Sequence, residues 1–181
     1  MKIYLALYLI LVATVSGNVV ELTDSDFDST LEGHTLALVM FYAPWCGYCK
    51  KMKPEFDKAA KTLVTGDNPV ALAKVDCTEA GKETCGRFEV RGYPTVKIFR
   101  NGELSQDYNG PREANGIIKY MKSQAGPASK ELKDAKDLSA TQEKSDVVIV
   151  GLFDSATEAE PFLKAANQLR EDADFAHSTV S

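Results

Sequence analysis

The stretch Ala43-Pro44-Trp45-Cys46-Gly47-Tyr48-Cys49-Lys50 lies between an apolar run, residues 36–42, and a helix-forming run, residues 50–63. The apolar run predicts a buried strand, so two cysteines with two residues between them stand where a strand turns into a helix. Unpaired N–H groups and the positive end of the helix dipole lower the pKa of a thiol placed in the first turn. We therefore expect Cys46 to be the exposed, attacking sulfur and Cys49, about one turn further on, to resolve the mixed disulfide.

The same CxxC pattern also occurs as one half of a zinc site. Structural zinc needs about four ligands, usually from two such pairs or from one pair and histidines. The other two cysteines, Cys77 and Cys85, are eight positions apart, and the two histidines, His34 and His177, flank neither pair. The spacing therefore favours redox chemistry with no metal or other cofactor.

Length, charge and the N-terminus narrow the class of protein further. The 181 residues suffice for one domain and part of another, and the net charge of -5 disfavours a nucleic-acid partner. Met1-Lys2 gives a positive start, residues 3–15 are almost wholly apolar, and Ser16-Gly17 are small. This pattern predicts a signal peptide over residues 1–17 and an oxidising compartment, with an N-terminal membrane anchor as the alternative.

The chain up to residue 126 alternates between strand and helix patterns. A helix predicted over residues 25–31 has Thr23 or Asp24 as its N-cap, and Asn101-Gly102 predicts a tight hairpin turn. Strands are predicted at residues 19–22, 35–42, 70–76, 95–100 and 103–108, further helices at 50–63 and 112–124, and a helix or loop at 77–88.

A second, cysteine-free part follows the break at residues 126–129, where Gly126-Pro127-Ala128-Ser129 predicts a domain boundary. A polar helix is predicted over residues 134–143, a buried strand over 146–153, a helix over 157–169 and the start of a strand over 175–180.

Several motifs together resemble the protein disulfide isomerase family, and among its members most of all the one that works on glycoproteins beside calnexin and calreticulin. Besides the APWCGxCK stretch, the resemblance rests on Lys74-Val75-Asp76-Cys77-Thr78, Arg91-Gly92-Tyr93-Pro94-Thr95, Ile98-Phe99-Arg100-Asn101-Gly102, Gly110-Pro111-Arg112 and Gln124-Ala125-Gly126-Pro127-Ala128-Ser129. It implies an α/β thioredoxin fold, a central mixed sheet flanked by helices. Residues 18–126 would form the redox-active domain, and residues 127–181 the beginning of a redox-inactive thioredoxin-like domain.

The resemblance also implies roles for particular residues. Tyr93-Pro94 would form a cis bond facing the cysteines and, with Trp45, contact substrate, although plain packing is the alternative for Trp45. Arg112 would swing toward Cys49 and lower its pKa, unless it is only a solvated residue at a helix start. Lys74 would pair with a buried glutamate. Cys77 and Cys85 would form a structural disulfide, with two free thiols as the alternative.

The sequence departs from the family pattern at two positions. Tyr48 stands beside Gly47 where the family usually has histidine, and a neutral phenol stabilises a thiolate less than an imidazolium does, so we expect a less acidic Cys46 and a less oxidising pair. Met40 stands where the family usually has the glutamate that relays protons to the inner cysteine. We expect a slow proton step at Cys49, and an outward-directed or re-paired Lys74.

Two functions follow from these expectations. The leading one is a thiol–disulfide oxidoreductase and isomerase acting on folding secretory proteins in the endoplasmic reticulum lumen. The alternative is a redox-weakened chaperone or substrate-binding module. Lectin chaperones are expected as partners only of a longer form, nucleic acid and membranes are not expected as partners, and the absence of a C-terminal KDEL signal leaves secretion open.

Overall fold

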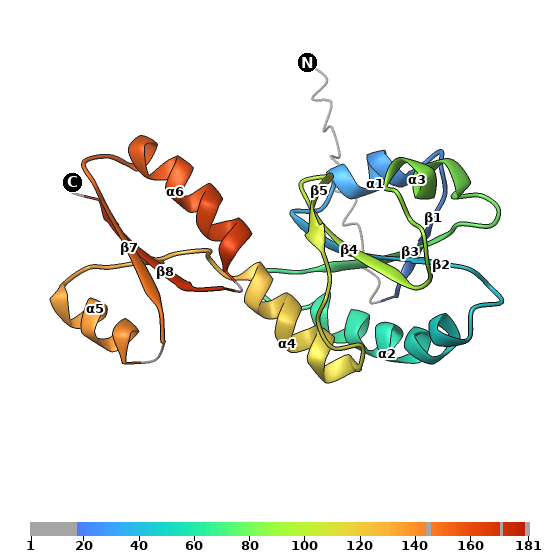
Figure 1. Ribbon diagram of the computed structural model, residues 1–181, viewed down its shortest axis with the longest axis horizontal. Helices are drawn as coiled ribbons and strands as arrows, with labels where there is room; N and C mark the ends of the chain where they lie inside the picture. Colours follow the sequence, from blue (N-terminus) through green and yellow to red (C-terminus); the bar gives the residue numbers. More distant parts are fainter. Residues whose placement is uncertain (1–17, 144–145, 171, 180–181) are drawn as a thin grey trace, which may run out of the picture.

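The computed structural model describes residues 18–143, 146–170 and 172–179 (Figure 1). The predicted signal peptide, residues 1–17, lies outside this range. Within it, no helix has the length and apolar character needed to cross a membrane.

The N-terminal unit is a five-stranded sheet in the order β1-β3-β2-β4-β5. β1, β3 and β2 run parallel, and β4 and β5 are antiparallel additions at one edge, so the sheet is mixed as predicted. Figure 1 shows α2 and α4 on one face and α1 and α3 on the other, which confirms the thioredoxin fold. The elements are β1 (Val20–Leu22), α1 (Phe27–Glu32), β2 (Leu36–Tyr42), α2 (Gly47–Leu63), β3 (Ala71–Asp76), α3 (Lys82–Arg87), β4 (Thr95–Arg100), β5 (Glu103–Asp107) and α4 (Ala114–Ala125).

Strand β2 is buried on both faces because each face meets a different helical layer. Leu36, Leu38 and Met40 pack with the α2 and α4 side, while the alternate residues 37, 39 and 41 pack with the α1 and α3 side. α2 contributes the predicted stripe of Met52, Phe56, Ala59, Ala60 and Leu63, all of them buried. A fully buried side chain such as Phe56 stabilises the fold by roughly 1.5–3 kcal/mol. This packing fixes the end of β2, and therefore the position of the cysteine motif.

The hairpin between β4 and β5 is formed at the predicted dipeptide. Asn101 and Gly102 have φ values of 50° and 84°. Positive φ at both central residues is what a two-residue turn needs if its twist is to match the twist of the strands.

The predicted cap of the first helix is wrong. α1 begins at Phe27 with Asp26 at its N-cap position, and Asp26 accepts hydrogen bonds from the N–H and the hydroxyl of Thr23. The carboxylate of Asp24 instead accepts from the N–H groups of Glu83 (3.1 Å) and Thr84 (2.7 Å) in the first turn of α3. Asp24 therefore caps a helix about sixty positions away, because the loop after β1 lies against the start of α3.

These carboxylates should make the fold acid-sensitive. Hydrogen bonds from Thr84 lower the pKa of Asp24, and the hydrogen bond from Arg87 lowers that of Asp28. Because the folded pKa lies below the unfolded one, the stabilisation is complete above the ordinary value of 3.8 and is lost as pH falls through the folded pKa. We expect the urea midpoint to fall between pH 4 and pH 2, and to fall less in Asp24→Asn. An equal fall in both proteins would assign the sensitivity to other carboxylates.

The C-terminal unit is a three-stranded parallel sheet in the order β6-β8-β7, with two helices. Its elements are β6 (Lys130–Glu131), α5 (Ala135–Gln142), β7 (Val148–Phe153), α6 (Ala156–Leu169) and β8 (Asp174–Thr179). The order strand, helix, strand, helix, strand repeats the opening of the N-terminal unit.

The predicted burial of the strand at residues 146–153 is wrong. β7 forms there, but Ile149 (41% exposed), Val150 (38%) and Leu152 (76%) face solvent. Among the described residues β7 pairs only with β8, and α6 contacts one part of it through Phe153 and Phe162. A strand is shielded fully only when neighbours cover both of its faces, so apolar composition alone did not bury this one.

Arg170 joins the two units. Its guanidinium donates to the carbonyl oxygens of Ser123 (2.6 Å), Gln124 (3.1 Å) and Gly126 (3.1 Å), where α4 ends. Arg100 of the first sheet donates to the same Gln124 carbonyl. Burial, together with the charge of Arg100, lowers the pKa of Arg170 to about 10. The two arginines occupy carbonyl oxygens that the end of a helix leaves without partners.

Candidate active site

The cysteine motif is placed by the end of β2 and the start of α2. α2 begins at Gly47, three positions earlier than the predicted helix, so Cys46 is its N-cap residue. Cys46 and Cys49 form a disulfide with their Cα atoms 5.2 Å apart, and Cys46 Sγ accepts a hydrogen bond from the N–H of Cys49 (3.1 Å). In the reduced state the same N–H groups and the helix dipole would stabilise a thiolate at Cys46.

The sulfur of Cys46 is not exposed, contrary to the prediction. Cys46 is 6% exposed and Cys49 is 3% exposed. Ala43, Tyr42 and Tyr93 pack around the two cysteines, and the disulfide draws Cys46 onto the first turn of α2. Cys46 is slightly more accessible than Cys49, and its role as the attacking sulfur stays a prediction.

An aromatic rim surrounds this disulfide. Trp45 is 71% exposed and Tyr48 is 69% exposed, and the Trp45 ring meets that of Tyr93 edge to face at 5.9 Å. The Tyr93–Pro94 peptide bond is cis, as the resemblance implied, and Tyr93 packs against the cysteine cluster. Large exposed rings beside a reactive group offer apolar contact to a peptide chain. The expected effect of Tyr48 on the pKa of Cys46 stays a prediction.

A cavity of about 270 Å³ lies beneath the disulfide. Its walls include Cys49, Met40 and Lys74, together with Tyr42, Ala43, Pro44, Lys50 and Lys53. Met40 and Lys74 are direct neighbours across β2 and β3. The position where the family usually has a glutamate therefore lines the same cavity as the inner cysteine, and here that position carries a thioether.

Lys74 pairs with a carboxylate other than the expected glutamate. Its ammonium forms an ion pair with Glu21 of β1, and the hydroxyl of Tyr42 donates to the same carboxylate at 2.6 Å. The Lys74 ammonium also lies 5.4 Å from the centre of the Tyr42 ring. Sequence reasoning missed Glu21. The one signal in the sequence that could have pointed to Glu21 is its charge, inside the otherwise apolar strand pattern Val19-Val20-Glu21-Leu22.

Arg112 lies in a different cavity from Cys49. It is exposed and lines a hollow of about 200 Å³ together with Pro94, Asp107, Tyr108 and Asn109. Its predicted movement toward Cys49 stays a prediction. A larger cavity of about 670 Å³ lies in the C-terminal unit around Ser129 and His177, and its lining includes no cysteine.

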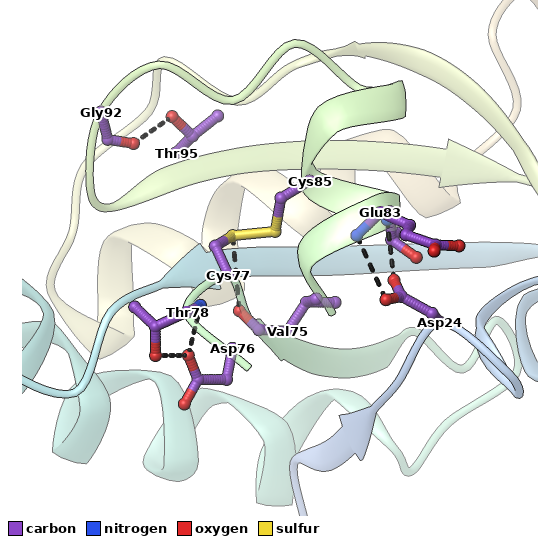
Figure 2. Close-up of a disulfide and its surroundings, with 10 residues drawn as sticks. Asp24, Val75, Asp76, Cys77, Thr78, Glu83, Cys85, Gly92 and Thr95 are labelled. Carbon is purple, nitrogen blue, oxygen red and sulfur yellow. Dashed lines mark hydrogen bonds between the residues drawn. A yellow bond between two sulfur atoms is a disulfide. The ribbon is translucent and has the colours of Figure 1, made fainter. Parts of the chain in front are cut away.

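The second cysteine pair is also joined. Figure 2 shows the Cys77–Cys85 disulfide connecting the end of β3 to α3, with Cα atoms 5.6 Å apart. The N–H of Cys77 donates to the carbonyl of Tyr42 (2.9 Å), so this bond lies next to the strand that leads into the active-site motif. The hydroxyl of Thr95 donates to the carbonyl of Gly92 (2.8 Å) and closes the turn that contains Pro94.

A disulfide at the first turn of the helix after β2, facing a cis-proline turn, defines a redox site of the thioredoxin class. The family model for thioredoxin matches residues 18–123. A protein disulfide-isomerase of Medicago sativa is 49% identical over 164 residues, which is 88% of this chain and 32% of that protein. The solution structure of the first thioredoxin domain of mouse protein disulfide-isomerase A4 is 36% identical, with a TM-score of 0.56, over 66% of this chain and 84% of that one.

This chain belongs to the protein disulfide isomerase family of thioredoxin-fold proteins. Both units together resemble human ERp44, with a TM-score of 0.71 and 27% identity over 89% of this chain and 45% of that structure. The chain spans about a third of the length of the curated relatives that it matches. These similarities confirm the family and do not single out the glycoprotein-specific member.

Proposed function

We propose that this chain catalyses the formation, reduction and rearrangement of disulfide bonds in folding secretory proteins. The observation that supports this best is the Cys46–Cys49 disulfide on the first turn of α2, inside a rim of exposed aromatic rings. In the reductive direction the Cys46 thiolate attacks a substrate disulfide and one substrate sulfur leaves as a thiolate. Cys49 then attacks Cys46, and the second substrate sulfur leaves, so two electrons pass from the cysteine pair to the substrate.

Location and partners form part of the same proposal. The predicted signal peptide and the curated relatives support the endoplasmic reticulum lumen as the place of action. Trp45 and Tyr48 suit apolar segments of unfolded chains as substrates. The assignment to the glycoprotein-specific member, with calnexin-type lectin partners of a longer form, rests on the sequence motifs alone.

A second function is favoured by one observation. Met40 gives the cavity beside Cys49 an apolar wall, and Tyr48 adds exposed aromatic surface at the rim. Slow exchange combined with a large apolar contact area would suit a substrate-binding module with weakened redox activity.

Reduction of insulin by glutathione, followed by turbidity, tests the proposal. The wild-type chain should accelerate it, and the double variant Cys46→Ser/Cys49→Ser, which keeps the rim, should not. A parallel assay measures how well each protein suppresses the aggregation of a reduced, unfolded client. Suppression by both proteins without any acceleration by the wild type would replace the enzyme with the binding module.

A further inference from the structure

Glu21, Lys74 and Met40 form a row across three adjacent strands. Glu21 is the register partner of Lys74 across β1 and β3, and Lys74 is the register partner of Met40 across β3 and β2. Register partners in neighbouring strands point to the same face of a sheet. Lys74 therefore has a thioether on one side and a carboxylate on the other.

Cys49 presents a problem of proton transfer. It is 3% exposed, so bulk water does not reach its sulfur directly. Exchange nevertheless requires Cys49 to lose a proton when it attacks Cys46 and to regain one when it leaves. The cavity of about 270 Å³ that borders Cys49 has room for water, and Tyr42 and Lys74, two residues with polar side-chain groups, are among those that line it.

The groups around this cavity differ in what they can do with a proton. The ammonium groups of Lys50, Lys53 and Lys74 favour a thiolate at Cys49 through their positive charge and are not proton acceptors. Burial and the hydrogen bond to Glu21 raise the pKa of Tyr42, so its hydroxyl stays protonated and can only pass a proton on.

Carboxylates near the cavity are the candidate acceptors. Glu21 is hydrogen-bonded to two groups of its wall, Tyr42 and Lys74. Asp57 lines a second cavity that shares Lys53 and Lys74 with this one, and Asp76 raises the pKa of Tyr42 through its charge. Of these three, Glu21 is the one that the hydroxyl of a cavity-lining residue contacts directly.

Building on the proposed exchange reaction, we propose that Glu21 takes and returns the proton of Cys49 through a water in the cavity and the hydroxyl of Tyr42. In the resolving step Cys49 gives its proton to the water, the water gives one to the Tyr42 oxygen, and Tyr42 gives its own to Glu21. The Cys49 thiolate bonds to Cys46, the bond from Cys46 to the substrate sulfur breaks, and that sulfur leaves as a thiolate. The side chain of Glu21, 46% exposed, releases the proton to solvent.

Stopped-flow oxidation by glutathione disulfide isolates this step. Trp45 is the single tryptophan and precedes Cys46, so its fluorescence reports both phases. Formation of the mixed disulfide depends on the glutathione disulfide concentration, and its resolution by Cys49 does not. We expect Glu21→Gln and Tyr42→Phe each to slow the concentration-independent phase ~10-fold at pH 7, which is less than the roughly 10²–10⁴-fold typical of general acid–base catalysis, with a smaller loss at pH 9. The concentration-dependent phase should not change.

Asp57→Asn is the matched control, because it removes a carboxylate from the second cavity that Lys74 lines. It should leave both phases unchanged. Met40→Glu in the Glu21→Gln background should restore the rate of the concentration-independent phase, since it returns a carboxylate to the row beside Lys74. The inference would be overturned if the concentration-independent phase were unchanged or faster in Glu21→Gln. It would also be overturned if Asp57→Asn slowed this phase as much as Glu21→Gln does. A wild-type chain that shows no oxidation at all would instead remove the proposed function.

Discussion

Replacing Cys49 with serine is expected to stop turnover after the first exchange and to leave the protein bound to its substrate through Cys46. The Cys49 Cα lies 5.2 Å from that of Cys46, so in the wild type the resolving thiol is permanently within reach of the mixed disulfide. An intramolecular nucleophile of this kind corresponds to a very high effective concentration, and losing it should slow release at least ~10³-fold. Non-reducing gels after incubation with a disulfide-bonded client should show a complex that reducing agent dissolves.

The single variant Cys46→Ser distinguishes the roles of the two cysteines. It should form no complex, because Cys49 is 3% exposed and lies inside α2, whereas Cys46 is at the N-cap position. A complex in Cys46→Ser would contradict the assigned order of attack, and wild-type turnover in Cys49→Ser would contradict the need for Cys49 as the resolving thiol. The second of these results would mean that a thiol of the substrate can resolve the mixed disulfide.

Removal of the Cys77–Cys85 disulfide should lower the stability of the fold and leave thiol–disulfide exchange at Cys46 and Cys49 intact. Cys77 and Cys85 are eight positions apart, and closing a loop of this length in the unfolded chain corresponds to about 2.5 kcal/mol. Both cysteines are buried against the α1 and α3 side of the sheet, so Cys77→Ala/Cys85→Ala also loses some packing. We expect the melting temperature to fall on the order of 10 °C, from the usual relation between stability and melting temperature.

Urea denaturation of the double variant beside Thr78→Ala measures this effect. Thr78 neighbours Cys77 and is exposed, and its hydroxyl donates to Asp76, so its truncation should cost much less stability. At 25 °C the folded double variant should keep wild-type exchange rates, because Cys46 and Cys49 are untouched. Equal midpoints for the two variants would mean that the disulfide contributes little to stability.

The sequence alone predicted the elements whose signals are local. The β2 and α2 patterns, the Asn101-Gly102 hairpin and the position of the cysteine pair where β2 leads into α2 were all confirmed. Each depends on contacts within one strand, one helix turn or one four-residue turn, so neighbours in the sequence carry the information.

The failed predictions all concern partners far away in the sequence. Asp24 was expected to cap its own helix and caps α3 instead, and Cys46 was expected to be exposed but lies under Tyr93. The apolar strand β7 was expected to be buried, and residues on it face solvent. Propensity and periodicity describe what a segment can form, and burial depends on what is packed against it.

What the sequence by itself determined is therefore the class of chemistry: two cysteines at the start of a helix behind a buried strand. Tertiary structure alone decided which carboxylate lies beside Lys74, in the wall of the cavity that borders Cys49. Met40 removed the expected carboxylate, and only the parallel register of β1 with β3 put Glu21 beside Lys74. The physical reason is that strand register is fixed by packing of the whole sheet, and a shift of one residue would turn Glu21 to the opposite face.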